Sequence, residues 1–313
     1  MENNKHFISA VIACYKDSES IPIMHERLEN IFTKIGCKYE IIFVNDGSPD
    51  NSEKVLEEIC LKDENTTAII HSRNFSSQNA FTIGMKHAKG DAVVLLDGDL
   101  QDPPEIIESF FNKWKEGYEV IYGIREKRDT SFFANLSYKL FYRIFKRLSY
   151  LDIPLDAGDF SLMDRKVVDA INSLDERDRF IRGMRSWVGF KQTGVKYNRP
   201  ERLFGTSTNN LFKNIRWAKK GIFSFSFIPL EAISYFSYFI FIVSIFVLLF
   251  YFISYFVFPG APKGITTLIL LVIFLGGIQL LAIGIVAEYV GKILEESKKR
   301  PHSIIRRIIN KNK

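Results

Sequence analysis

The sequence predicts an α/β fold, in which helices cover both faces of a parallel sheet, followed by two helices that cross a membrane. In the first 125 residues, short apolar runs alternate with segments of helical periodicity, an order typical of β-α-β units. The apolar residues of those runs are continuous rather than alternating, as expected for strands that are buried on both faces. The last third of the chain contains two uncharged stretches, each longer than the roughly 20 residues that span a bilayer.

The expected strands and helices alternate from the N-terminus. Phe7–Cys14 is the first apolar run, and residues 18–35 carry apolar side chains at helical spacing. The further expected strands are 39–44, 68–71, 91–97 and 118–123. Three further helices are expected: one that begins near Asn51, one at 79–88, and one from Pro103 to about Lys115. This order places the carboxyl ends of the strands along one edge of the sheet.

Acidic side chains follow three of these strands. Tyr15 and Asp17 come after the first strand and Asp46 after the second, while Asp97 and Asp99 end the strand at 91–97, within the run L-L-D-G-D-L-Q-D-P-P. Ligands bind beyond this edge in open α/β sheets, and carboxylate oxygens are preferred ligands of Mg²⁺. Any one cluster could be a solvated turn, because Asp, Gly and Pro are common turn residues. Three clusters on one edge favour a binding site.

The composition of the chain and the absence of two nucleotide-binding motifs limit the classes of function that the sequence supports. The chain has no G-x-G-x-x-G after its first strand and no G-x-x-x-x-G-K-[ST], which disfavours dinucleotide and P-loop chemistry. A metal ion and arginines would then have to neutralise any phosphate. The net charge of +6 indicates an anionic partner, and the apolar C-terminal third favours a membrane over nucleic acid. The 3 cysteines lack metal-ligand spacing and are expected as free thiols.

Four motifs resemble glycosyltransferase family 2, and more narrowly its polyprenyl-phosphate glycosyltransferases. They are V-I-A-C-Y-K-D, V-N-D-G-S-P-D-N-S, S-R-N-F and A-K-G-D-A-V-V-L-L-D-G-D-L-Q-D-P-P-E, and the resemblance continues to the end of the chain. It implies a GT-A (Rossmann-like) domain that transfers a sugar, with inversion, from a nucleotide sugar to undecaprenyl or another polyprenyl phosphate. The product would serve cell-envelope glycan modification. Likeness to bactoprenol glucosyltransferases makes UDP-glucose the expected donor, while N-acetylglucosamine, galactose and mannose stay open.

The resemblance also implies roles for the acidic edge. Asp46 matches the family aspartate that accepts a hydrogen bond from the nucleotide base. The residues implied to bind the nucleotide are Ala13, Tyr15, Asp17, Asp46 and Asp97. The implied ligands of a Mg²⁺ or Mn²⁺ ion are Asp99, Asp97 and Gln101.

The middle of the chain continues the resemblance. The run D-A-G-D-F makes Asp159 the expected catalytic carboxylate and Asp156 the second choice, unless these acids cap a helix that begins near Arg165. Ser161 stands where the family often has arginine. A lipid phosphate, with a second pKa near ~6, is mostly ionised at neutral pH, so its attack requires positioning more than deprotonation. The run Y-N-R-P-E-R-L-F-G-T-S is close to a family signature, and the residues implied to bind the lipid phosphate or the diphosphate are Arg125, Arg199, Arg202 and Ser207.

The C-terminal third is expected to anchor the enzyme as a hairpin spanning about 232–258 and 265–288. Basic residues flank both ends of the hairpin, whereas its turn holds only Lys263, so the positive-inside rule places both termini and the catalytic domain in the cytosol, at the inner (plasma) membrane. The expected divisions are a GT-A domain at 1–208, an interfacial helix at 209–228, the hairpin at 229–291 and a basic tail at 292–313. The isoleucines of the tail would lie on the anionic leaflet.

Several alternatives stay open at this point. The basic, aromatic-rich helix expected at 132–148 could pack on the sheet or lie in the membrane interface. A processive polysaccharide synthase is disfavoured, because the chain lacks a Q-x-x-R-W motif and further spans. An inactive membrane adaptor would retain the fold without turnover. Aromatic-rich hairpins can associate, so a homo-oligomer is also possible.

Overall fold

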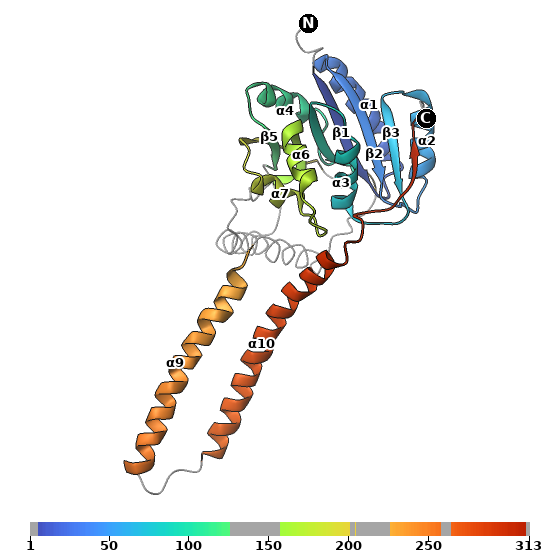
Figure 1. The fold of residues 1–313 in the computed structure, drawn as a ribbon. Coiled ribbons are helices and arrows are strands. Elements are labelled where there is room, and N and C mark those ends of the chain that lie inside the picture. Colours follow the sequence, from blue (N-terminus) through green and yellow to red (C-terminus); the bar gives the residue numbers. More distant parts are fainter. Residues whose placement is uncertain (1–5, 126–156, 201–203, 205–225, 258–263, 311–313) are drawn as a thin grey trace.

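A computed structural model of the 313-residue chain describes residues 6–125, 157–200, 204, 226–257 and 264–310. Within these residues an eight-stranded sheet with helices on both faces precedes two long apolar helices (Figure 1). The first nine elements are β1 (Phe7–Cys14), α1 (Ser20–Ile35), β2 (Lys38–Asn45), α2 (Ser52–Lys62), β3 (Thr66–His71), α3 (Ser77–His87), β4 (Ala92–Asp97), α4 (Ile106–Lys115) and β5 (Val120–Arg125). The strands and helices expected in this region are thus confirmed, with small shifts at their ends.

The sheet is mixed rather than wholly parallel. Its strand order is β7-β5-β6-β4-β1-β2-β3-β8. The pairs β1–β2, β1–β4 and β2–β3 are parallel, as expected, and β5 also pairs parallel with β7, a strand that was not predicted. The expectation of an all-parallel sheet fails at β6 (Ala157–Asp164), which runs antiparallel between β4 and β5. This strand was not expected, because its pairing partners are distant in the sequence.

The elements after β6 are α6 (Arg165–Ser173), α7 (Ile181–Trp187) and β7 (Gln192–Tyr197). Asp164 caps α6, because its Oδ1 accepts a hydrogen bond from the backbone N–H of Lys166 at 3.1 Å. The alternative that Asp159 caps this helix is therefore wrong, and Asp159 lies inside β6 with its side chain buried.

The C-terminal isoleucines form a strand in place of the lipid-facing tail that we expected. β8 (Ile305–Ile309) pairs antiparallel with β3 and supplies hydrogen-bonding partners to an otherwise open sheet edge. Ile309 is only 7% exposed and belongs to the core of the sheet. Arg306 and Arg307, which we expected near anionic lipid, pair instead with Glu53 and Glu57 of α2.

Two apolar layers enclose the sheet. Helices α1, α2 and α4 pack on one face together with residues such as Ile8 and Ile12 of β1. Helices α3, α6 and α7 cover the other face, where Val11 and Ala13 of the same strand point. The strand is apolar apart from Ser9 because both of its faces are buried. Cys14, Cys37 and Cys60 are free thiols within this core, as expected.

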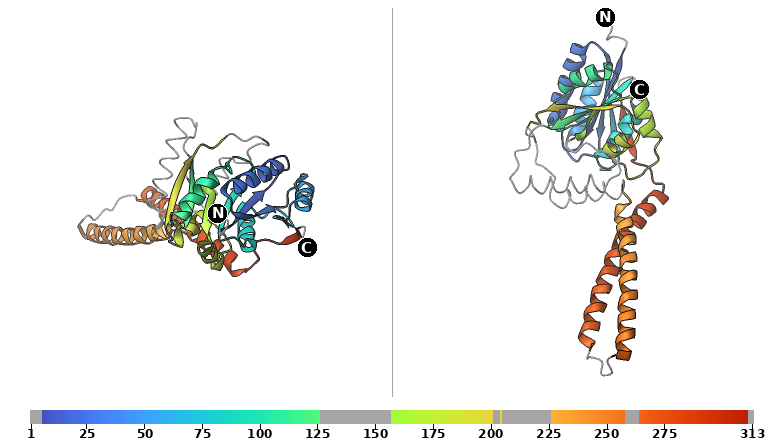
Figure 2. Two further views of the ribbon diagram at one scale, coloured as in Figure 1. Left: turned by 90° about the horizontal axis from the view of Figure 1, so that it is seen from above. Right: turned by 90° about the vertical axis from the view of Figure 1, so that its left-hand side faces the viewer.

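Helices α9 (Ile228–Val257) and α10 (Ile265–Ser297) extend away from the sheet domain (Figures 1 and 2). They contain candidate membrane spans at Ile228–Val247 and Leu271–Ser297, whose apolar side chains are exposed, which indicates membrane association. In Figure 1 the chain enters β1 on the side of the sheet far from the helices, so the carboxyl ends of the parallel strands lie on the side of α9 and α10. The helix expected at 132–148 and nearly all of the interfacial segment at 209–228 lie outside the described residues.

Candidate active site

The carboxyl ends of β1 and β4 meet at a close backbone contact. The N–H of Gly98 donates to the carbonyl oxygen of Ala13 at 2.9 Å, and a Cβ at Gly98 would lie 3.0 Å from Oδ2 of Asp17. A glycine between the two acids of D-G-D therefore lets β4 end directly beside β1. Three predicted residues, Ala13, Asp17 and Asp97, are brought together in this way. Tyr15 follows with its side chain 37% exposed, and its backbone N–H donates to Asp17 Oδ2 at 2.9 Å.

Negative charge accumulates around Asp97. Burial, together with the carboxylates of Asp102, Asp99 and Asp159, raises the pKa of Asp97 to about 8, although Arg199 opposes the shift. A carboxyl group in such surroundings resists ionisation until a cation compensates its charge. The same edge of the sheet therefore favours binding of a positive ion.

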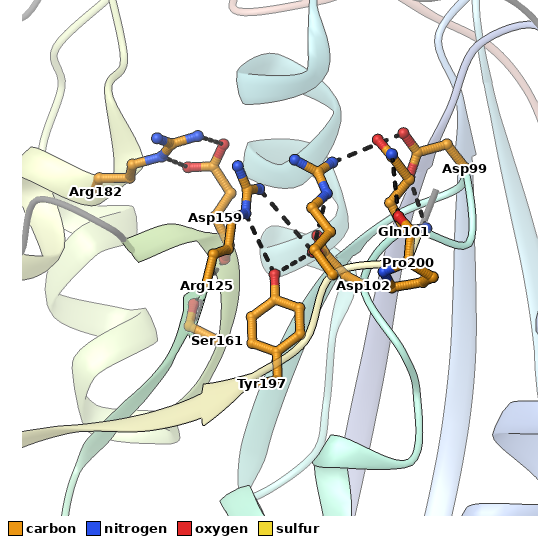
Figure 3. Close-up of polar contacts among 10 residues, drawn as sticks. Asp99, Gln101, Asp102, Arg125, Asp159, Ser161, Arg182, Tyr197 and Pro200 are labelled. Atoms are coloured by element: carbon orange, nitrogen blue, oxygen red, sulfur yellow. Dashed lines mark hydrogen bonds and ion pairs between the residues drawn. The ribbon is translucent and has the colours of Figure 1, made fainter. Parts of the chain in front are cut away.

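Asp99 and Gln101 shape the turn that follows β4. Asp99 Oδ1 accepts a hydrogen bond from the backbone N–H of Gln101 at 3.1 Å, and Arg199 Nη2 lies 4.0 Å from Asp99 Oδ2. The side-chain amide of Gln101 donates to the carbonyl oxygen of Pro200 at 3.4 Å (Figure 3). Gln101, predicted as a metal ligand, thus links this turn to the segment that carries Arg199.

Asp102, the last acid of the run L-L-D-G-D-L-Q-D-P-P, is the centre of a buried polar cluster. The Tyr197 hydroxyl donates to Asp102 Oδ1, and Nη2 of Arg125 and Nε of Arg199 each lie 4.0 Å from that oxygen (Figure 3). Arg125 Nε in turn donates to the Tyr197 hydroxyl at 3.4 Å. Asp102 Oδ2 is buried and has no hydrogen-bond partner within the described residues. Two predicted phosphate-binding arginines thus converge on a carboxylate with an unused acceptor.

Two glycines make room for this cluster. A Cβ at Gly123 would lie 2.6 Å from the ring of Tyr197, and a Cβ at Gly158 would lie 2.9 Å from Nη2 of Arg125. A glycine is therefore required in the D-A-G-D-F run, because a larger residue would occupy the space of the Arg125 guanidinium group.

Asp159, the predicted catalytic carboxylate, is held by three hydrogen bonds. Arg182 Nε donates to Oδ1 at 3.0 Å and Nη2 to Oδ2 at 3.2 Å (Figure 3). Gln78 Nε2 donates to Oδ2 at 3.0 Å. Burial alone would raise the pKa of Asp159, but Arg182, Arg185 and Gln78 outweigh it, and the pKa falls below its ordinary value. The group is an ionised and well-paired carboxylate, which makes it a weak general base.

Neither Arg182 nor Gln78 is among the predicted site residues. Gln78 also accepts a hydrogen bond from the backbone N–H of Ile181 at 2.8 Å, so it joins α3 to the start of α7. A second unpredicted residue of α7, Arg185, is 1% exposed and lies over the ring of Tyr122, 5.1 Å from its centroid. No local sequence signal pairs these side chains with Asp159, because they lie on separate elements.

Asp46 is placed at the end of β2, as predicted, but most of its hydrogen-bonding capacity is used internally. Its Oδ1 accepts from the backbone N–H of Phe75 at 2.8 Å and from Nδ1 of His71 at 2.9 Å. Its Oδ2 accepts from the backbone N–H of Ser76 at 2.8 Å. A carboxylate has about four acceptor positions, so roughly one is left for a ligand. The remaining predicted residues, Asp156, Arg202 and Ser207, lie outside the described residues.

The residues at this edge fit a hard divalent cation. Asp97 and Asp99 offer carboxylate oxygens, and Mg²⁺ in particular is often bound by one or two carboxylates together with substrate phosphates. A different group, His25, Glu29 and Asp63, has ligand atoms within 4.8 Å of one another. There, His25 Nε2 already lies 3.0 Å from Asp63 and 3.1 Å from Thr66 Oγ1. These contacts link α1 to the α2–β3 connection, so we assign that group a structural role.

Comparisons with known proteins cover nearly the whole chain. The family model described as glycosyl transferase family 2 matches residues 9–171. The uncharacterized glycosyltransferase YkcC of Bacillus subtilis (strain 168) is 42% identical over 303 residues, which cover 96% of this chain and 93% of that protein. The bactoprenol glucosyl transferase of Shigella phage SfV is 36% identical over 302 residues, 96% of this chain and 98% of that protein. Among solved structures, glucosyl-3-phosphoglycerate synthase from Mycobacterium tuberculosis with Mn²⁺ and UDP-glucose has a TM-score of 0.46 and 14% identity, covering 70% of this chain and 77% of that chain.

Proposed function

This chain belongs to glycosyltransferase family 2 and has its GT-A-like fold, and we propose that it transfers glucose from UDP-glucose to undecaprenyl or another polyprenyl phosphate. The transfer would occur with inversion at the cytosolic surface of the membrane. One observation carries the proposal: the acid and arginine side chains gather at the carboxyl ends of the strands. In Figure 1 those strand ends lie on the side of α9 and α10. The full-length similarity to proteins named bactoprenol glucosyl transferase supports the lipid acceptor and the sugar.

The donor would bind along the carboxyl ends of β1, β2 and β4. Asp46 would accept a hydrogen bond from the base, with Ala13, Tyr15 and Asp17 around the nucleoside. Asp97 and Asp99 would hold Mg²⁺ or Mn²⁺, which would offset the charge of the diphosphate as it leaves.

The acceptor phosphate would meet the arginines that surround Asp102. Arg125 and Arg199, together with Arg202 and Ser207, would hold and orient it, because guanidinium groups bind phosphate through paired hydrogen bonds. A phosphate oxygen then forms a bond to C1 of glucose while the bond from C1 to the nucleoside diphosphate breaks. The nucleophile arrives ionised, so no side chain has to remove a proton.

Asp159 fits this chemistry as a group that positions others. Its ion pair with Arg182 fixes α7 beside β6, and its negative charge contributes to the raised pKa of Asp97. An ionised carboxylate close to the reaction centre also favours the positive charge that develops on the sugar ring during transfer.

The proposal is tested with the full chain in lipid nanodiscs that contain undecaprenyl phosphate. UDP-glucose, UDP-N-acetylglucosamine, UDP-galactose and GDP-mannose are each added with Mn²⁺, and the lipid products are analysed by mass spectrometry. We expect one hexose to be added from UDP-glucose. If sugar were transferred only from another donor, the proposed identity of the sugar would be wrong. Addition of several sugars to one lipid would indicate a polymer synthase. If no donor gave a glycosylated lipid, the proposal would be overturned.

A further inference from the structure

Three buried side chains connect the C-terminal segment with the predicted base-binding residue. Ser303 Oγ lies 3.1 Å from Nε2 of His71, and Nδ1 of the same ring lies 2.9 Å from Oδ1 of Asp46. Ser303, His71 and Asp46 are 8%, 1% and 2% exposed, respectively. The segment that follows α10 therefore reaches a residue proposed to contact the donor nucleotide.

The proton positions in this chain of contacts follow from the chemistry of each group. An ionised carboxylate only accepts hydrogen bonds, so Nδ1 of His71 donates to Asp46. In the neutral ring Nε2 then accepts the hydroxyl proton of Ser303. Asp46 thus selects the tautomer, and the serine fixes the orientation of the ring that holds Asp46.

The same order of contacts occurs in the Ser-His-Asp triads of hydrolases. Here the acid has a different task, because Asp46 also accepts the backbone N–H groups of Phe75 and Ser76. Ser303 lies in the segment that leads into β8, is 8% exposed and faces His71 at the end of β3. The arrangement therefore suits orientation of Asp46 rather than nucleophilic attack.

The C-terminal segment is fixed on both sides of Ser303. Before it, Glu296 Oε1 at the end of α10 accepts the backbone N–H of Arg177 at 2.7 Å. After it, the carbonyl oxygen of Ile304 accepts the backbone N–H of Ser72 at 2.9 Å, and β8 then pairs with β3. These contacts hold Ser303 in place against His71, the last residue of β3.

The contacts of Asp46 extend this arrangement to the other half of the site. Ser76, whose backbone N–H it accepts, precedes α3 and has a φ of 81°, a conformation that a non-glycine residue rarely adopts. Gln78, two residues further on, donates to Asp159 at 3.0 Å. The start of α3 therefore depends on Asp46 and in turn supports Asp159.

We propose that Ser303, carried by the segment that follows the second membrane helix, is a positioning residue for the donor nucleotide and acts through His71 on Asp46. This inference rests on the proposed function, because it takes Asp46 as a contact of the nucleotide base. The donor site is then built from both ends of the chain, and the sheet domain requires the segment after α10 to bind its donor fully.

The test compares Ser303→Ala with wild type as the full chain in nanodiscs, using titration with UDP and steady-state kinetics with UDP-glucose. Loss of one buried hydrogen bond should raise the Kd for UDP and the donor KM by about 2- to 12-fold while kcat at saturating donor changes less than twofold. Ser303→Thr retains a hydroxyl and should restore both constants. His71→Asn, which can still donate to Asp46 but does not reach Ser303, should reproduce the effect of Ser303→Ala.

Arg306→Ala is the matched control, because it removes an exposed ion pair with Glu53 from β8 and leaves the Ser303–His71 contact intact. It should leave the Kd for UDP unchanged. Equal binding of UDP by Ser303→Ala and wild type, or an equal loss in Arg306→Ala, would overturn the inference while the proposed function stands. If wild type bound neither UDP nor GDP, the proposed function and the inference would fail together.

Discussion

Arg182 holds the carboxylate of Asp159 with two nitrogens, Nε at 3.0 Å from Oδ1 and Nη2 at 3.2 Å from Oδ2. Paired hydrogen bonds of this kind fix the direction of a carboxylate as well as its charge. Every contact of this pair favours the ionised form, and the pKa of Asp159 is accordingly lowered, although burial opposes the shift. Asp159 is therefore better suited to hold α7 and offer a fixed negative charge than to accept a proton.

Asp159→Asn should accordingly lose less activity than the roughly 10²–10⁴-fold that removal of a general base costs. The reason is that the phosphate nucleophile is already ionised at neutral pH. Single-turnover kinetics with saturating donor measures the chemical step, and titration with UDP shows whether the donor site is intact. Complete inactivity with unchanged UDP binding would mean that Asp159 does act as a base.

Asp99→Ala should abolish transfer, because Asp99 is a proposed cation ligand. Transfer should also stop when EDTA removes divalent ions and should return when Mn²⁺ or Mg²⁺ is added. Circular dichroism and detergent-extraction profiles should stay as in wild type, since Asp99 is only partly buried. Asp169→Ala, which removes an exposed carboxylate on α6, is the control and should keep full activity. Substantial turnover by Asp99→Ala would show that Asp99 is not a required ligand of the cation.

Cation binding should tighten as pH rises toward about 8. The pKa of Asp97 is raised to about 8 by burial and by the neighbouring carboxylates, so below that pH a cation must displace a proton from this group. Each pH unit below 8 should then weaken the apparent affinity for Mn²⁺ by up to about tenfold. Calorimetric titration with Mn²⁺ at several pH values measures the slope. In Asp97→Asn the affinity should be lower and its dependence on pH nearly flat, and an unchanged slope would contradict the assignment.

The strands and the acidic edge could be predicted from the sequence because their signals are local. Each strand from β1 to β5 is a short, mainly apolar run, and the acids that follow β1, β2 and β4 are close to the strand end in the chain. Once the strands are known to be parallel, their carboxyl ends must lie together, which brings Asp17 and Asp97 into one place.

The remaining parts of the site depend on pairings between distant residues. Asp159 and Arg182 lie 23 residues apart, and Ser303 lies 232 residues from His71. Nothing in the local pattern around β6 indicates its antiparallel neighbours. The basic, isoleucine-rich tail was expected to face the membrane, because the sequence around Arg306 and Arg307 gives no sign of their partners, Glu53 and Glu57 on α2.

Lower pH should destabilise the attachment of the C-terminal segment through His302. Burial, followed by the nearby charges of Arg179, Lys86 and Arg177, lowers the pKa of His302 to about 4. The unfolded chain, with a histidine pKa of about 6.5, therefore binds a proton between pH ~6.5 and ~4 that the folded chain does not bind. The free energy of unfolding should fall across this window by about 1 kcal/mol, after allowing for the partial exposure of the ring.

Thermal unfolding in detergent at several pH values measures this fall. His302→Gln carries no titrating ring, so its melting temperature should depend less on pH than that of wild type. Parallel pH profiles for the two proteins would show that His302 does not contribute.

Two neighbouring isoleucines of β8 distinguish a structural strand from a membrane-bound tail. Ile309 is 7% exposed and Ile308 is 36% exposed, since successive side chains of a strand point to opposite faces. Ile309→Ala should lower the free energy of unfolding by about 2–4 kcal/mol, because it leaves a cavity in the core, whereas Ile308→Ala should cost less than about 1 kcal/mol. Chemical denaturation of the two variants in detergent gives both values. If the tail bound lipid instead, the two substitutions would weaken liposome binding equally and leave the stability of the sheet unchanged. That outcome would show that β8 is not a strand of the sheet.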